Sequence, residues 1–267
     1  MATEYFFEAG EIKLPILLSS PHSGTEFPDG LRPTLKSEFR KHPQDTDWFI
    51  HRLYGFVKEL GIPMIHARYS RYVVDLNRDP EETSLYGDGR VETGLVPVMS
   101  FAQQSLYEGA EPDDEEKRLR VKCYHRPYHE KVQSVLSDIR SRFGVALLFD
   151  AHSIKRFVPS IRQTPFPDVI LGNQRGKTAG NFLIESAWKT LENSAFSAAH
   201  NDPFMGGYIT RHFGRPDEGQ HALQLEMSQD LYMNESEATW NPEKALAVQR
   251  VLRDLLQDLG KLLLGAR

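Results

Sequence analysis

Two apolar runs of strand length, each ending abruptly in polar residues, constrain the fold of this chain more than any other feature. Residues 14–18 are apolar, and His22 and Gly24 follow shortly after a Ser-Ser-Pro sequence. Residues 145–149 form the second run, which leads directly into Asp150 and His152. Open α/β sheets build binding sites from polar groups at the carboxyl ends of short buried strands. A core strand and a solvated turn would explain the first run alone, but the recurrence favours a site at a sheet edge.

The rest of the chain predicts strands that alternate with helices. Further strands are expected at residues 63–67, 72–76, 168–172 and 221–227. Helical periodicity is found at residues 45–61, 112–142 and 178–191 and again after residue 241. This alternation predicts a single three-layer α/β/α domain over residues 1–267, with helices on both faces of a mixed, mostly parallel sheet.

The last expected strand contains a carboxylate. Glu226 lies between Leu225 and Met227, and a carboxylate in an apolar strand is costly unless it is paired or chemically employed. Shortly before it, two glycines at 206–207 suggest a close backbone approach, followed by a short strand that contains Thr210 and Arg211. Glu226 is therefore the acidic residue least easily explained as surface decoration.

Composition and charge exclude several classes of function. The net charge is −5, and no run of Lys and Arg offers the basic face that nucleic acid or an anionic membrane requires. The single cysteine, Cys123, cannot form an internal disulfide. The N-terminus has no signal-peptide pattern, and no stretch approaches the length of a membrane span. We therefore expect a cytoplasmic protein whose partner is a small molecule, and the sequence leaves its oligomeric state open.

The polar residues at the expected strand ends suit a divalent metal. Catalytic zinc takes three His or carboxylate ligands and leaves one position open for water. Asp45 and Asp47 lie at the start of an expected helix, where capping is the alternative role. His125 and His129 are four residues apart, but Pro127 lies between them and no Glu follows His125, so they do not form the zincin motif. Serine-hydrolase elbows and phosphate-binding P-loops have no counterpart in the sequence.

Six short motifs in a fixed order resemble the N-formylglutamate amidohydrolase family. The resemblance extends from about residue 22 to residue 233 and includes His22-Ser23-Gly24, Asp45-Thr46-Asp47, Asp75-Leu76-Asn77-Arg78, Tyr128-His129, Asp150-Ala151-His152-Ser153 and Leu225-Glu226-Met227. The resemblance implies hydrolysis of N-formyl-L-glutamate in histidine degradation. It also implies a metal-dependent fold similar to that of zinc carboxypeptidases and aspartoacylase.

The resemblance assigns His22 and His152 as metal ligands, with Asp47 as the carboxylate ligand. The more distant relatives use a His-x-x-Glu pair as ligands, but in this sequence the residue three positions after His22 is Thr25. Glu26 and Asp45 remain the alternatives to Asp47. Zinc is the expected metal, although iron, cobalt and manganese accept the same ligands.

The resemblance also implies roles in catalysis and substrate binding. Glu226 corresponds to the general base, and Arg71 to an arginine that stabilises the oxyanion. The residues expected to bind substrate are Asn77, Arg78, His129, Ser153, Thr210 and Arg211. Two alternatives remain: an amidohydrolase for another N-acyl or N-formyl amino acid, and a non-catalytic protein that binds such compounds.

Overall fold

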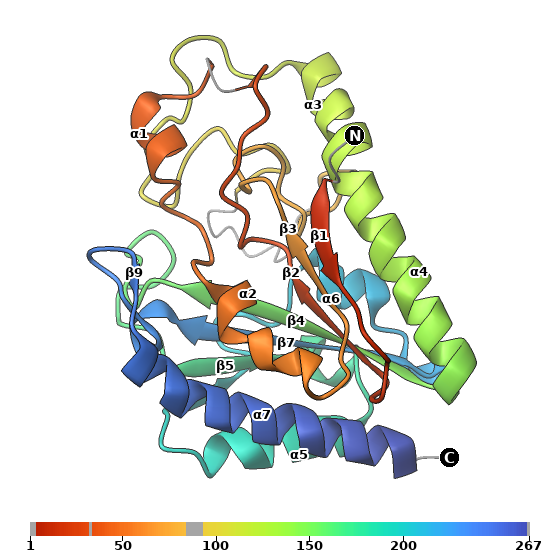
Figure 1. The fold of residues 1–267 in the computed structure, drawn as a ribbon. Coiled ribbons are helices and arrows are strands. Elements are labelled where there is room, and N and C mark those ends of the chain that lie inside the picture. The colour runs from red at the N-terminus through yellow and green to blue at the C-terminus, as the bar shows by residue number, and fades with distance from the viewer. Residues whose placement is uncertain (1–3, 32–33, 84–92, 266–267) are drawn as a thin grey trace.

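A seven-stranded mixed sheet organises the computed structural model, which describes residues 4–31, 34–83 and 93–265. Across the sheet the order is β1-β3-β2-β4-β7-β5-β6 (Figure 1). The strands are β1 (Tyr5–Glu8), β2 (Ile16–Ser20), β3 (Met64–Ala67), β4 (Ala146–Ile154), β5 (Val169–Gly172), β6 (Ala198–His200) and β7 (Gln220–Ser228). A separate two-stranded sheet pairs β8 (Met233–Asn234) with β9 (Thr239–Trp240).

The four central strands of the large sheet run parallel to one another. β3, β2, β4 and β7 are neighbours in this order, and each adjacent pair among them is parallel. β1 is antiparallel to β3, and β5 is antiparallel to β7. The carboxyl ends of the central strands therefore meet at one edge of the sheet, which is where ligands bind in open α/β folds.

Helices cover both faces of the sheet. The longer helices are α3 (Asp114–Arg120), α4 (Arg126–Phe143), α5 (Asn181–Glu192), α6 (Tyr208–Phe213) and α7 (Pro242–Gly265). Helices α5 and α7 pack on one face, whereas α4 and α6 pack on the other (Figure 1). Two shorter helices, α1 (Ser37–Lys41) and α2 (Ile50–Leu53), precede β3. The predicted α/β class, with a mixed and mostly parallel sheet between helical layers, is confirmed.

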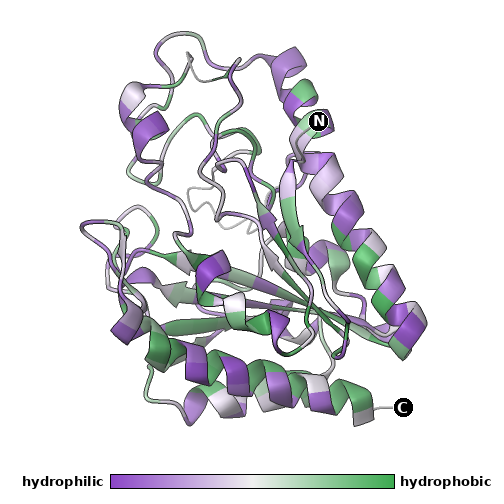
Figure 2. Cartoon of the chain, in the orientation of Figure 1, coloured by the Kyte–Doolittle hydropathy of each residue, from purple (hydrophilic) through white to green (hydrophobic). Residues whose placement is uncertain are grey.

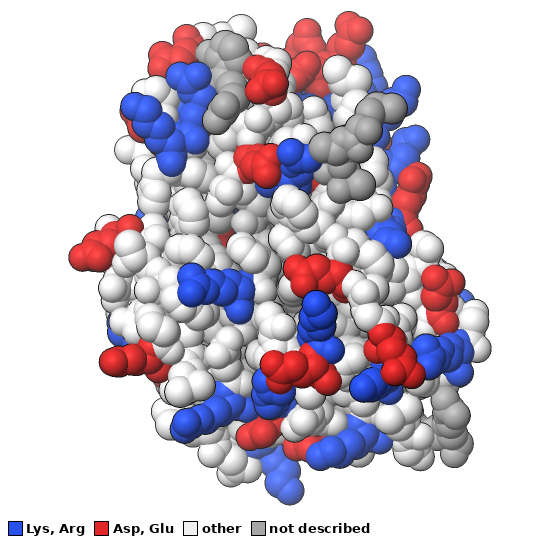
Figure 3. Space-filling view, in the orientation of Figure 1, with Lys and Arg blue, Asp and Glu red and all other residues white. Residues whose placement is uncertain are grey.

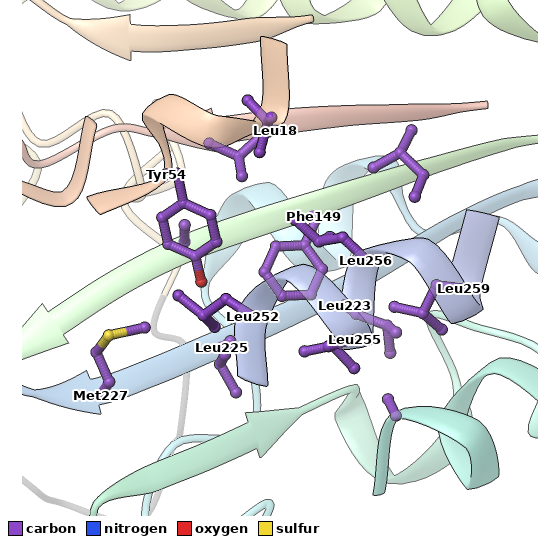
Figure 4. Close-up of a cluster of buried hydrophobic side chains, with 14 of the residues drawn as sticks. Leu18, Tyr54, Phe149, Leu223, Leu225, Met227, Leu252, Leu255, Leu256 and Leu259 are labelled. Carbon is purple, nitrogen blue, oxygen red and sulfur yellow. The ribbon is translucent and has the colours of Figure 1, made fainter. Parts of the chain in front are cut away.

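Alternate residues of β4 and β7 face different layers. Phe149 and Leu225 belong to the core beneath α5 and α7, as Figure 4 shows. Leu148 and Ala222 point to the opposite face and pack with α4 and α6. Every residue of both strands is buried, and the apolar colour of the sheet in Figure 2 contrasts with the polar outer face of α4. This explains why the two strands read as nearly continuous apolar runs in the sequence.

The face toward α4 and α6 changes from apolar to polar along each strand. In β4, Asp150 and His152 continue the side that Leu148 occupies, because side chains alternate between faces. In β7, Glu226 continues the side of Ala222 and is paired in register with His152. The polar end of this face lies at the carboxyl edge of the central strands, and it forms the floor of the site.

Residues 72–76 do not form the predicted strand. They are buried, but the segment turns: the Asp75 amide donates to the carbonyl of Leu95, and the Arg78 amide donates back to the carbonyl of Asp75. The apolar pattern reflects burial on both sides of an irregular segment, since Val74 packs beneath α4 while Tyr72 packs in a separate cluster with Phe39. The apolar pattern indicates that a segment is buried, but it does not distinguish a buried irregular segment from a buried strand.

Other predicted elements differ in their extent. The prediction of a short strand at 208–211 is wrong, because these residues belong to helix α6. The helix expected over 45–61 is broken into α2 and a 3-10 turn at Gly55–Lys58. The helix expected over 112–142 consists of α3, a π-helical turn, η3 (Val121–His125), and α4, in which Pro127 is the second residue. Much of the glycine-rich loop at 86–100 lies outside the described residues.

Surface charge is mixed on the face shown in Figure 3, where basic and acidic side chains are interspersed. Among the helices of the described ranges, none combines the length and the apolar character needed to cross a membrane.

Candidate active site

A small cavity at the carboxyl edge of the central strands contains most of the residues singled out from the sequence. Its volume is about 90 Å³. The residues that were predicted and that line it are His22, Asp47, Arg71, Asn77, Arg78, His152, Ser153 and Glu226. They come from the ends of β2, β4 and β7 and from the segments that precede α2 and follow β3. A larger cavity of about 340 Å³ adjoins it and shares Phe101, Ser153 and Ile154 as lining.

His22, Asp47 and His152 form a buried cluster that could hold a metal ion. Each offers one ligand atom, and these atoms lie within 4.8 Å of one another. Oδ2 of Asp47 lies 3.1 Å from Nδ1 of His152 and 3.8 Å from Nδ1 of His22. Two imidazole nitrogens and a carboxylate oxygen, all turned to one point, match the donor set of a catalytic zinc site.

The second ring nitrogen of each histidine faces a different carboxylate. Nε2 of His22 lies 2.7 Å from Oδ1 of Asp75, and Nε2 of His152 lies 3.0 Å from Oδ2 of Asp150. Because an ionised carboxylate only accepts hydrogen bonds, it holds the proton on Nε2 and leaves Nδ1 available toward Asp47. Carboxylates placed behind ligating histidines in this way orient the rings in metal sites.

The pKa values of the two histidines shift in opposite directions. Burial and the nearby Arg71 lower the pKa of His22, although Asp75 opposes them. Burial alone would lower the pKa of His152, but Asp150 and Asp47 hold it well above its ordinary value. When no cation is bound, the two carboxylates therefore stabilise the protonated form of His152. The same negative charges also favour the binding of a metal ion.

Asp47 is placed by the backbone next to His22, and its carboxylate does not cap a helix. The amide of Asp47 donates to the carbonyl of His22 at 3.0 Å, and α2 begins three residues later without a side-chain cap. Asp45 points elsewhere, because its Oδ2 accepts from the Tyr72 hydroxyl and from the Phe101 amide.

Glu26, the other alternative ligand, is exposed at the surface. Its carboxylate accepts a hydrogen bond from Nε of Arg68 at 2.8 Å. Of the three carboxylates considered from the sequence, only Asp47 is grouped with the histidines.

Glu226 lies beside the cluster in a position that favours proton transfer. It is buried in β7, opposite His152 in β4, and the structure gives it no ion-pair partner within 4 Å among the described residues. Burial raises the pKa of Glu226 to about 8; Asp47 adds to this, whereas His152 and Arg71 oppose it. A carboxyl that titrates near neutral pH can both accept and donate a proton during a reaction.

Arg71 is buried at the side of the cavity and is paired with Asp75. Its Nη2 donates to Oδ2 of Asp75 at 2.5 Å, and its guanidinium lies 4.9 Å from the centre of the Phe101 ring. Burial alone would raise the pKa of Asp75, but Arg71 and His22 hold it well below its usual range. Asp75 is therefore a fixed negative charge that links the arginine to the first histidine.

Asn77 and Arg78 also line the cavity. Nδ2 of Asn77 lies 3.2 Å from Nε2 of His152, and Oδ1 of Asn77 accepts from the amide of Ile209 at 2.8 Å. The guanidinium of Arg78 donates to the carbonyl and hydroxyl oxygens of Thr93. Both side chains are anchored where a substrate carboxylate could bind.

Three of the predicted substrate-binding residues do not line the described cavity. His129 lies on α4 behind Leu76, whose carbonyl is 2.8 Å from its Nε2. Thr210 Oγ1 lies 3.4 Å from Oδ2 of Asp150, and Nε of Arg211 donates to the carbonyl of Gly206. Ser153 does line the cavity, and its Oγ lies 2.7 Å from the Tyr232 hydroxyl oxygen.

The sequence did not predict the roles of Asp75 and Gln224. Asp75 was seen only as part of a motif, yet it contacts both His22 and Arg71. Gln224 lines the cavity two residues before Glu226, and its Oε1 accepts from the amide of Gly207. The alternation of β7 could have indicated Gln224, since residues two apart share a face.

The fold and this cavity place the protein in a class of α/β enzymes. These have a cluster of histidines and a carboxylate at the carboxyl edge of a mixed sheet. The family model for N-formylglutamate amidohydrolase matches residues 14–233. The chain belongs to the N-formylglutamate amidohydrolase family.

Individual relatives agree with this assignment. The chain is 40% identical over 250 residues to an N-formylglutamate deformylase of Pseudomonas putida, covering 92% of each chain. It is 39% identical to the deformylase of Pseudomonas aeruginosa, covering 92% of this chain and 93% of the relative. Its fold is similar to a crystal structure of N-formylglutamate amidohydrolase from Ralstonia eutropha JMP134, with a TM-score of 0.83 at 24% identity, covering 98% of this chain and 99% of the other.

Proposed function

We propose that this chain hydrolyses N-formyl-L-glutamate to formate and L-glutamate, using one divalent metal ion, for which zinc is the expected choice. The observation that carries the proposal is the grouping of His22, Asp47 and His152 within 4.8 Å, in one cavity with Glu226 and two arginines. The named activity of relatives at about 40% identity supports the choice of substrate.

The metal would be held by His22, Asp47 and His152. When bound there, a divalent cation would supply positive charge that polarises the formyl carbonyl and lowers the pKa of water. The donor set fits such an ion, because the carboxylates of Asp75 and Asp150 already hold the Nε2 protons and leave the Nδ1 atoms for it.

Glu226 would move the protons of the reaction. It would accept a proton from the attacking water as the bond to the formyl carbon forms, and then donate that proton to the nitrogen of glutamate as the C–N bond breaks. Burial raises the pKa of Glu226, which suits the return of the proton, and a cation held beside it would lower this pKa again, which suits its acceptance. Arg71 would stabilise the negative oxygen of the tetrahedral intermediate from the side of the cavity.

Arg78 and Asn77 would bind a carboxylate of the substrate. The planar guanidinium can donate two parallel hydrogen bonds to a carboxylate, and N-formylglutamate has two carboxylates. Ser153 lines the same cavity and would contact the substrate there. Thr210 and Arg211 would contribute indirectly through Asp150 and the Gly206 backbone.

A second candidate substrate is an N-acyl glutamate with a longer acyl chain. The observation that favours it is the adjoining cavity of about 340 Å³, whose lining includes Phe157 and Val158. A formyl group needs none of this space, whereas an alkyl chain could occupy it.

We further propose that residues 1–267 act as one catalytic domain, because the cavity draws side chains from both halves of the chain. A role in histidine degradation and a cytoplasmic location stay predictions from the sequence, as does the absence of nucleic-acid and membrane partners.

The decisive experiment is formate release from N-formyl-L-glutamate by the purified protein, before and after chelation and after zinc is added back. We expect release that is lost on chelation and restored by zinc. His152→Ala should lose both metal and turnover, whereas His42→Ala, on an exposed residue outside the cavity, should keep both. Protein that holds stoichiometric metal but releases no formate would contradict the choice of substrate, and N-acetyl- and N-hexanoyl-glutamate would then be tested.

A further inference from the structure

Two histidines from the helical segment of η3 and α4 hold the backbone on either side of Asn77. We propose that His125 and His129 are positioning residues, which fix the 75–78 segment so that Asn77 and Arg78 face the cavity; the part played by Arg78 rests on the proposed function. Nε2 of His129 lies 2.8 Å from the carbonyl oxygen of Leu76, and Nε2 of His125 lies 2.9 Å from that of Arg78.

The two histidines complete the hydrogen bonding of a segment that has no regular structure. The carbonyl of Asp75 accepts from the Arg78 amide, and that of Asn77 accepts from Nη1 of Arg78. The carbonyls of Leu76 and Arg78 receive their bonds from the histidines instead of a neighbouring strand. Buried backbone carbonyls need partners, so this irregular segment depends on the side chains behind it.

The histidine rings are themselves held rigidly. His125 and His129 are four residues apart on one side of the helix, and their rings stack with centroids 4.1 Å apart and planes inclined by 15°. The ring of His129 also stacks on Phe213 of α6 at 5.7 Å. Burial lowers the pKa of both histidines, and a neutral ring facing a carbonyl must carry its proton on Nε2. The pair is therefore a preformed set of two donors.

The segment that these donors hold reaches the active site directly. Asn77 contacts Nε2 of His152 through its side chain, and its Oδ1 accepts from the amide of Ile209 at the start of α6. Arg78 projects into the same cavity, and its guanidinium is bonded to Thr93. A small displacement of the Leu76 or Arg78 carbonyl would move both side chains relative to a bound substrate. Displacements of about 1 Å are enough to cost large factors in rate or binding.

The test compares two substitutions of His129 that differ in one hydrogen bond. His129→Leu removes the donor, whereas His129→Gln keeps an N–H near the position of Nε2. We expect KM for N-formyl-L-glutamate to rise by about tenfold or more in His129→Leu, since an unpaired buried carbonyl distorts the segment, with a smaller change in kcat. His129→Gln should recover most of the affinity. Metal content, measured by atomic emission, should be unchanged in both.

His212→Leu is the matched control. His212 lies in the same ring cluster, 6.2 Å from His129, and its Nδ1 is hydrogen-bonded to the Tyr208 hydroxyl and not to the 75–78 segment. Its KM should stay near that of the wild type. If His129→Leu does not fold, as judged by thermal unfolding, the pair His125→Leu and His125→Gln gives the same comparison at the Arg78 carbonyl.

Amide hydrogen exchange over residues 74–80 gives a readout that is independent of substrate. Exchange should accelerate in His129→Leu and not in His212→Leu. Faster exchange together with a wild type that is inactive on N-formyl-L-glutamate would retain the positioning role and reject the proposed function. An active wild type with unchanged KM and exchange in folded His129→Leu and His125→Leu would overturn the positioning role. Equal losses in His129→Leu, His129→Gln and His212→Leu would also overturn it, because they would indicate ring packing alone.

Discussion

Nε2 of His22 lies 2.7 Å from Oδ1 of Asp75, although the two residues are 53 positions apart in the sequence. The same carboxylate accepts a hydrogen bond from Arg71 through its other oxygen. One aspartate thus sets the orientation of a candidate metal ligand and neutralises a buried guanidinium. This double contact makes Asp75 a sensitive point in the candidate site.

Asp75→Asn should weaken both metal binding and the fold. The substitution leaves Arg71 buried without its counter-charge, which we expect to lower the free energy of unfolding by about 3–5 kcal/mol. It also loosens the ring of His22, which should reduce zinc affinity by about 10- to 100-fold. Denaturant unfolding and competition with a chromogenic chelator measure the two effects. Asp258→Asn, which breaks an exposed pair with Lys261, should change neither, and equal effects in the two variants would contradict this role for Asp75.

Glu226→Gln should leave the metal site intact and remove most of the turnover. An amide cannot accept and return a proton, and general acid–base catalysis contributes about 10²–10⁴ in rate. We expect kcat for formate release to fall by that order while metal content stays at the wild-type level. Gln133→Ala removes a polar side chain on α4 whose hydrogen bond goes to Ser137 and not into the cavity, so its kcat should stay near the wild-type value. Turnover that survives in Glu226→Gln would assign the base elsewhere.

Gly207→Ala should disturb Asn77 through a direct steric clash. A Cβ atom on Gly207 would lie 2.3 Å from Nδ2 of Asn77, a side chain whose Oδ1 already accepts from the amide of Ile209. We expect kcat/KM to fall by about 10- to 100-fold, because a displaced anchor misplaces the substrate. Gly55→Ala introduces the same methyl group into open space and should leave kcat/KM unchanged. Equal kinetics for the two variants would show that the clash is relieved without cost.

Acid should destabilise the protein partly through His66. Burial lowers the pKa of His66 to about 4 from the ordinary 6.5, with a contribution from His51, so the native state keeps this ring neutral. Between these pH values the unfolded chain binds a proton that the native state does not. Stability should therefore fall as the pH decreases from about 6.5 to about 4, by about 1.4 kcal/mol per pH unit from this residue.

His66→Phe provides the control for this prediction. Phenylalanine keeps the stacking on Phe6 and His51 but does not titrate. Denaturant unfolding across this pH range should give a shallower slope for the variant, whereas the two proteins should have the same slope above pH 7. Identical slopes at acid pH would assign the acid sensitivity to other groups.

The sequence predicted the parts of the site that are carried by regular strands. His152 and Glu226 follow from apolar runs whose burial is nearly complete, and such runs identify central strands of parallel sheets well. The resemblance named Asp47 as the carboxylate ligand but left Asp45 open as an alternative, and the structure groups Asp47 with the two histidines. That choice depends on Tyr72 and the Phe101 backbone, which bind Asp45 from distant positions in the chain.

The segment at 72–78 shows why the rest could not be predicted. Its apolar residues suggest a strand, but Asp75 bonds to His22 and Arg71, and two histidines from a distant helix take the carbonyls of the segment. None of these partners is local, and propensity and periodicity describe only local preferences. The resemblance assigned His129 to substrate binding, whereas the structure places it outside the cavity lining, against the carbonyl of Leu76.

The register of β4 and β7 has a consequence for which changes in length the chain can tolerate. The strands pair over nine residues, from Ala146 with Gln220 to Ile154 with Ser228, and this pairing sets Glu226 opposite His152. Because side chains alternate between faces, deleting one residue in the middle of β7 would turn Glu226 toward the apolar layer beneath α7 and bring Leu225 or Met227 to the cavity. Insertions and deletions in natural variants should therefore be found in the surface turns. Those inside β4 and β7 should be removed by selection, because they would displace Glu226 from His152.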